Sequence, residues 1–87
     1  MKEVIYSRQF LRASLKLSKN IHNKLDELIS IVATNPFHSL LHTKQLSGDF
    51  EHLYSFRITR DWRVIFSIES NDTIKLLDVA HRKDIYR

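Results

Sequence analysis

The segment LYSFRITRDWRVIFSI, residues 53–68, decides the fold of this chain. Apolar and polar residues alternate over residues 53–58 and again over residues 62–68, which is the period of a half-buried strand. The three residues between the two runs are polar and are expected to form the loop of a hairpin. The large side chains of this hairpin share one face, which we expect to cover the core: Tyr54, Phe56, Ile58, Trp62, Val64, Phe66 and Ile68.

The register of this hairpin follows from its apolar face. For both apolar runs to lie on one side of the sheet, a three-residue loop must place Arg57 opposite Arg63. Like charges at directly opposite positions destabilise a sheet by roughly 0.2–1 kcal/mol. The pair is explained equally well by an anion bound between the two arginines or by a solvated network in which Asp61 or Asp78 neutralises them.

Two helices are expected ahead of the hairpin. Ser7 is a suitable N-cap for a short helix over residues 8–17, and Ser18 is a suitable N-cap for a second helix. Apolar residues in the second helix recur at the helical period from Ile21 to Val32. Pro36 ends this helix, because the residue before a proline is disfavoured in the helical conformation.

The predicted fold is α+β. Residues 3–6 and 73–80 have the composition of strands and complete the order β-α-α-β-β-β, with residues 37–52 irregular. We predict a four-stranded antiparallel sheet with a two-helix hairpin on one face. At 87 residues, the chain has room for one domain, which we place over residues 1–87.

Composition limits the classes of function. The chain has no cysteine, which favours a reducing compartment and excludes thiol nucleophiles and thiol metal sites. The N-terminus has no apolar signal core, and no apolar run approaches the roughly 18 residues of a membrane span, so we expect a cytoplasmic protein without membrane contact. The net charge of +4 favours an anionic partner, either nucleic acid or an acidic protein segment.

The final residues form a second candidate site. The tail His81-Arg82-Lys83-Asp84-Ile85-Tyr86-Arg87 leaves the last predicted strand directly, so its start lies beside the sheet. It offers an imidazole, several cations and a phenol, which are the groups needed to cleave a phosphodiester and stack a base. An ordinary solvated basic tail is the alternative, and it is the commoner explanation of such a composition.

Other histidines and aromatics carry less information. His38 and His42 have the i, i+4 spacing of zinc ligands, but they lie in an irregular stretch without a third ligand, so we predict no metal site. Trp62 has the right chemistry to stack a base, yet the alternation places it with the core. Lys44 is on its own only a surface lysine.

Five short motifs follow one another along the chain: PF at 36–37, LSG at 46–48, SFRIT at 55–59, WRVIF at 62–66 and HRKDIY at 81–86. Together with the order of elements they resemble the RelE/ParE toxin superfamily, and the match favours its RNA-cleaving branch of RelE, YoeB and YafQ. The resemblance covers essentially the whole chain.

This resemblance implies a type II toxin that cleaves mRNA, usually in the ribosomal A site, without a metal or other cofactor, and that a cognate antitoxin protein inhibits. The 2′-hydroxyl of the RNA attacks the adjacent phosphate and leaves a 2′,3′-cyclic phosphate. By position, the resemblance implies four catalytic residues: Arg57, Arg63, His81 and Tyr86. It also implies RNA contacts by Lys44, Arg60, Arg82 and Lys83.

The chain departs from its relatives at the general base. The YoeB group brings a glutamate from the loop before LSG, whereas residues 40–45 here contain no carboxylate. His81 is then the strongest titratable candidate for proton transfer. Two rival functions remain: a ParE-like toxin that inhibits DNA gyrase without cleaving RNA, and a degenerate member that only binds its antitoxin.

Overall fold

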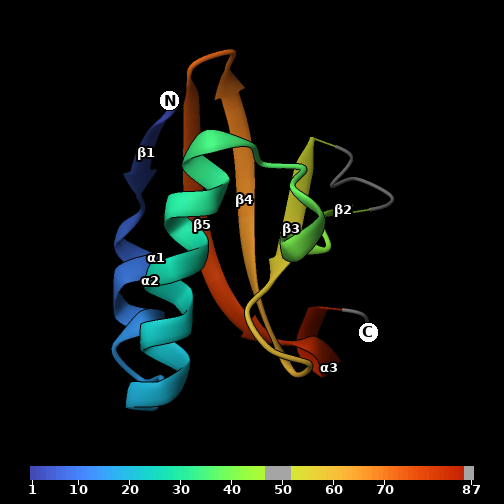
Figure 1. Cartoon of the computed structure of the whole chain (residues 1–87). Coiled ribbons are helices and arrows are strands. Elements are labelled where there is room, and N and C mark those ends of the chain that lie inside the picture. The colour runs from blue at the N-terminus through green and yellow to red at the C-terminus, as the bar shows by residue number, and fades with distance from the viewer. Residues whose placement is uncertain (47–51, 86–87) are drawn as a thin grey trace.

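The computed structural model describes residues 1–46 and 52–85 of the chain (Figure 1). Its helices are α1 (Arg8–Ser14), α2 (Lys19–Thr34), the short 3-10 helix η1 (Ser39–Leu41) and α3 (Arg82–Ile85). Its strands are β1 (Glu3–Tyr6), β2 (Lys44–Gln45), β3 (Leu53–Arg57), β4 (Trp62–Ser70) and β5 (Thr73–His81). Figure 1 shows α1 and α2 side by side against one side of the sheet, with α3 at the far end of β5.

Both long helices begin where the sequence predicts. The Ser7 hydroxyl accepts a hydrogen bond from the backbone N–H of Phe10 at 3.0 Å, and the Ser18 hydroxyl caps α2 in the same way. α2 ends at Asn35, whose backbone is extended, immediately before Pro36. α1 is shorter than predicted, because the helix ends at Ser14 instead of residue 17.

The hairpin has the predicted register. β3 and β4 pair antiparallel, with Arg57 opposite Arg63 and Phe56 opposite Val64. Phe56, Val64 and Phe66 are fully buried in one core with residues of α1 and α2. The side chains of Arg57 and Arg63 therefore project from the opposite face of the sheet, away from the two helices.

The sheet differs from the prediction in strand number and direction. It has five strands in the order β1-β5-β4-β3-β2, and β1 pairs parallel with β5. The additional strand is β2, two residues long, in a stretch that we expected to be irregular. Strands β2 to β5 alternate in direction. The additional strand β2 therefore reverses the direction of β5, which runs parallel to β1 instead of antiparallel. The prediction of a four-stranded, fully antiparallel sheet is therefore wrong, whereas the α+β class is correct.

The face without the long helices is partly covered. Arg63 is only 4% exposed there, and Ser55 and Ser67 on the same face are also buried. α3 follows directly at the end of β5. The first residue of α3 is held by a hydrogen bond of 2.7 Å from the backbone N–H of Arg82 to the carbonyl of Asp61. Across residues 1–46 and 52–85, no helix has the length and hydrophobicity of a membrane span.

Candidate functional site

A cavity of about 340 Å³ opens on the face of the sheet away from α1 and α2. Each of the described residues that line it is a cation, and each comes from a different element or turn: Lys44, Arg57, Arg60, Arg63 and Arg82. β3 and β4 supply the central pair, the turn between them supplies Arg60, β2 supplies Lys44, and α3 supplies Arg82. We call these five residues the basic cavity.

Arg63 is held firmly within the basic cavity. Its Nε donates to the Ser55 hydroxyl at 2.9 Å, and its Nη2 donates to the carbonyl oxygens of His42 at 2.7 Å and Ser55 at 3.2 Å. These three acceptors are neutral, and they hold the guanidinium in one orientation. A buried charge that is oriented in advance stabilises an anion more than a mobile surface charge does.

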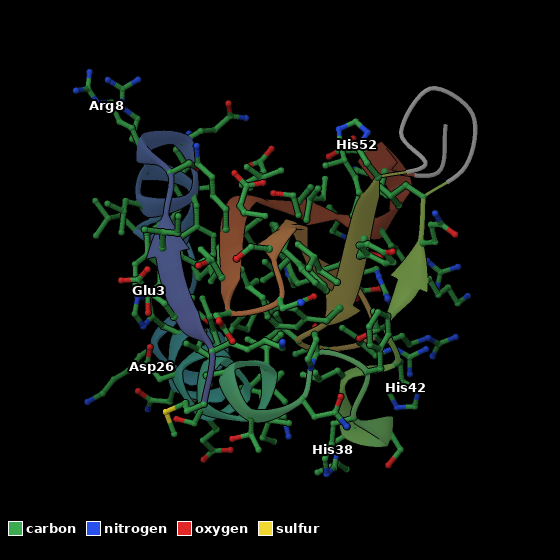
Figure 2. The ribbon with its side chains drawn as sticks, turned by 90° about the horizontal axis from the view of Figure 1, so that it is seen from above. Glu3, Arg8, Asp26, His38, His42 and His52 are labelled. Carbon is green, nitrogen blue, oxygen red and sulfur yellow. The ribbon has the colours of Figure 1, made fainter. Side chains whose placement is uncertain are left out.

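The connection after α2 supplies one of these acceptors. His42 follows η1 with a left-handed backbone, φ 49° and ψ 46°, and its carbonyl is turned toward Arg63. Figure 2 shows His42 on the β2 side of the molecule, across from Glu3 in β1. The sequence indicated Ser55 only as a residue on the same face as Arg63, and it gave no sign that His42 contributes a backbone group.

The other four cations are more accessible. Arg57, Arg60, Lys44 and Arg82 are all exposed to solvent. Five positive charges around one cavity repel one another, and no carboxylate is among the described residues that line it. An arrangement of this kind favours binding of an anion with several oxygen atoms, such as a phosphodiester.

The structure does not bring His81 into the basic cavity. His81 pairs with Trp62 across β4 and β5, and the two rings meet edge to face at 5.3 Å. Cross-strand partners share a face, and Trp62 packs against the core, so His81 lies on the helix side of the sheet. The proton-transfer role that we assigned to His81 from the sequence stays a prediction, and this geometry does not support it.

Of the two other tail cations predicted to contact RNA, one lines the basic cavity and one does not. Arg82, next to His81, lines the basic cavity, whereas Lys83 is exposed and does not line it. The backbone N–H of Lys83 donates to Nδ1 of His81 at 3.3 Å. Tyr86 and Gly48 lie outside the described residues.

Comparisons with known proteins identify the family and the fold of this chain. The family described as "ParE toxin of type II toxin-antitoxin system, parDE" matches residues 4–86. A YoeB/ParE toxin from Agrobacterium tumefaciens superposes with a TM-score of 0.78 at 18% identity, over 92% of this chain and 98% of that one. No curated protein matches by sequence.

Two antitoxin complexes contain similar chains. The archaeal RelE-RelB complex from Pyrococcus horikoshii matches with a TM-score of 0.76 at 27% identity, over 93% of this chain and 94% of that one. The DinJ-YafQ complex from E. coli matches with a TM-score of 0.76 at 17% identity, over the full length of both chains. A family match over nearly the whole length, on a fold shared with these structures, shows that this chain belongs to the RelE/ParE superfamily of toxins from type II toxin-antitoxin systems.

Proposed function

We propose that this toxin is a metal-independent endoribonuclease that cleaves mRNA at the ribosome, and that the basic cavity is its active site. The observation that carries the proposal is the fixed guanidinium of Arg63 among four further cations. A cleaved phosphodiester passes through a crowded state with additional negative charge on its oxygens. Cations placed in advance around that phosphate lower the barrier.

The proposed reaction uses the RNA's own nucleophile. The 2′-oxygen forms a bond to the adjacent phosphorus, the bond from phosphorus to the 5′-oxygen of the next nucleotide breaks, and the products are a 2′,3′-cyclic phosphate and a 5′-hydroxyl. The proton of the 2′-hydroxyl passes to a water molecule, and the ammonium group of Lys44 delivers a proton to the departing 5′-oxygen. Arg57 and Arg63 stabilise the non-bridging oxygens, and Arg82 contacts the leaving group or its neighbouring phosphate.

Lys44 is the residue of the cavity that we assign to proton transfer. Arginine does not lose its proton in proteins, so the four arginines act through charge and hydrogen bonds alone. Lys44 reaches the cavity from the edge strand β2, opposite Ser55 in β3. Arg60 and Lys83, both exposed, contribute contacts with the RNA backbone farther from the scissile bond.

The proposed setting is the bacterial or archaeal cytoplasm, with a cognate antitoxin as the protein partner. RelE and YafQ, which share this fold, crystallised with the antitoxins RelB and DinJ. For this chain, a short acidic segment of the antitoxin would be attracted to the basic cavity and would exclude RNA from it.

The decisive experiment is the chemistry of the cut ends. We expect the purified protein, incubated with ribosomes and mRNA, to leave a 2′,3′-cyclic phosphate and a 5′-hydroxyl. Substituting a 2′-deoxynucleotide at the scissile position removes the nucleophile and should abolish the cut. Cleavage of the deoxy substrate, or a 5′-phosphate at the cut end, would contradict the proposal.

Inhibition of DNA gyrase is a second candidate function, because the matching family is described by its ParE toxin. In that case, the toxin would act by binding gyrase, and the basic cavity would have no chemical role. Supercoiling assays run beside the RNA assays separate the two functions. Inhibition of supercoiling that persists in Arg63→Gln, without any RNA cleavage by the wild-type protein, would favour gyrase.

A further inference from the structure

A second cavity, of about 360 Å³, lies on the helix side of the same end of the sheet. It forms between α1 with the turn after it and the adjoining ends of β4 and β5. The residues of interest in its lining are Gln9, Arg12, Lys16, Leu17, Trp62 and Asp78. The reaction proposed above uses none of them.

Trp62 gives this cavity an aromatic wall. Its indole is partly buried against the core and partly accessible, and the His81 ring meets it edge to face at 76°. Aromatic side chains that stay accessible beside cations are the usual platform for the bases of single-stranded nucleic acid, because every base presents a π-face.

The charge of this cavity also suits a polyanion. Arg12 and Lys16 are exposed, and they lie on one face of α1 and the following turn. Asp78, the one carboxylate among the described residues of the lining, already accepts hydrogen bonds from Gln9 Nε2 at 2.9 Å and from the backbone N–H of Val79 at 2.8 Å. Among the described lining residues, two exposed cations are therefore opposed by one carboxylate, which is already hydrogen-bonded.

The two cavities are linked through consecutive residues. Trp62 lines the second cavity and Arg63 the basic cavity, because neighbours in a strand point to opposite faces. In the same way, His81 contacts Trp62 on the helix side, while Arg82 lines the basic cavity. The two cavities lie on opposite faces of the same sheet, and Arg60 lies in the turn between β3 and β4.

We propose that the second cavity binds a nucleotide of the same RNA strand that occupies the basic cavity. The strand passes around the β3–β4 turn, a base stacks on the indole of Trp62, and the neighbouring phosphates contact Arg12 and Lys16. This inference rests on the proposed function for the identity of the ligand as RNA. It adds a binding subsite that is remote from the scissile bond.

Trp62 is the only tryptophan of the chain, so its fluorescence reports directly on this cavity. The probe is a single-stranded RNA made of 2′-O-methyl nucleotides, which bind but cannot be cleaved. We expect saturable quenching at low salt. An otherwise identical oligonucleotide with abasic sites should bind through its phosphates with little quenching, since no base reaches the indole.

Variants test which residues hold the strand. Arg12→Gln with Lys16→Gln should weaken binding at least about tenfold. The matched control is Arg8→Gln, which removes an exposed cation of α1 that does not line the cavity, and it should change affinity much less (Figure 2). Trp62→Leu, checked for folding by circular dichroism, should lower the affinity, followed by the anisotropy of labelled RNA, by roughly 5- to 100-fold.

Three results would overturn the proposal: equal losses in Arg8→Gln and the double variant, equal quenching by the abasic probe, or equal quenching by polyglutamate, which would make the cavity a site for acidic protein. Cleavage is measured separately. If the protein cleaves RNA but fails these binding tests, only the proposal for the second cavity is contradicted. If it passes them without cleaving RNA, only the proposed nuclease function is contradicted.

Discussion

Arg63 donates a hydrogen bond of 2.7 Å from Nη2 to the carbonyl oxygen of His42, which is the only non-glycine residue with a positive φ in the described part of the chain. A left-handed backbone costs a residue with a Cβ about 1–2 kcal/mol. A hydrogen bond to a charged group contributes about 1.5–3 kcal/mol. The loop conformation and the position of Arg63 therefore stabilise each other.

This relationship predicts an asymmetry between two substitutions of His42. His42→Gly removes the steric penalty at φ 49° but increases the conformational entropy of the unfolded chain. Because the two effects oppose each other, the free energy of unfolding should change by less than about 0.5 kcal/mol. His42→Val places a β-branched residue in the same conformation and should lower that free energy by about 1–2 kcal/mol. Urea denaturation measures both. Equal effects would mean that the backbone conformation carries no strain.

Arg63 should matter for stability as well as for cleavage. Arg63→Met keeps the apolar stem but leaves the buried Ser55 hydroxyl and the His42 carbonyl without their donor. We expect the free energy of unfolding to fall by about 2–4 kcal/mol and cleavage to fall at least about 10²-fold. A variant as stable as the wild type would show that the hydrogen bonds around Arg63 are not needed for folding.

Arg57, unlike Arg63, should matter for cleavage but not for stability. Arg57→Ala removes an exposed charge that faces Arg63 across the hairpin, so stability should be unchanged or higher by up to about 0.5 kcal/mol. Cleavage should still fall by about 10²-fold, because a contact with the phosphate is lost. The salt dependence of RNA affinity should also lose about one log unit of slope. Unchanged cleavage would make Arg57 a solvated surface residue.

The end of β5 offers a test between neighbouring residues. His81→Gln should lower the cleavage rate by less than about tenfold, because the imidazole lies outside the basic cavity, whereas Arg82→Ala should lower it at least about 10²-fold. Single-turnover kinetics on one RNA compares them. The reverse order would return proton transfer to His81 and require the tail to rearrange on binding RNA.

Lys44 can be tested with a substitution that preserves charge. If Lys44 exchanges a proton, Lys44→Arg should be almost as impaired as Lys44→Gln, each by about 10²-fold or more. RNA binding, measured by anisotropy, should stay close to the wild type in Lys44→Arg. Full activity of that variant would limit Lys44 to holding the phosphate backbone.

The hairpin could be predicted from the sequence because alternation leaves little freedom. Once Phe56 and Val64 must share the core face, Arg57 and Arg63 are forced together on the other, as the structure confirms. The helix caps at Ser7 and Ser18 are equally local signals, each set by one side chain and the backbone amides that follow it.

The direction of β1 could not be predicted in this way. β2 consists of Lys44 and Gln45 alone, and two polar residues show no alternation. Because neighbouring strands from β2 to β5 run in opposite directions, leaving out β2 reverses the predicted direction of every later strand relative to β1. The α+β class does not depend on this direction.

The face on which His81 lies could not be predicted for a different reason. His81 and Arg82 are neighbours in the sequence, but they leave β5 on opposite sides of the sheet. The pairing of β4 with β5 has two irregularities, at Ile65/Phe66 and Ile68/Ser70. Because of them, the alternation of side chains between the two faces cannot be followed by counting residues along β5. Only the direct pairing of His81 with Trp62 reveals its face.

The parallel pairing of β1 with β5 also has a consequence for when the toxin becomes active. Among the described strands, β1 has no neighbour other than β5, and the Ser7 hydroxyl that caps α1 donates a hydrogen bond to the carbonyl of Leu77, 70 residues later. Contacts so far apart in sequence form slowly, since the loop between them must close first. During synthesis, β1 must wait until β5 has emerged from the ribosome. The completed fold, and with it Arg82 at the basic cavity, therefore arises only after nearly all of the domain has been translated.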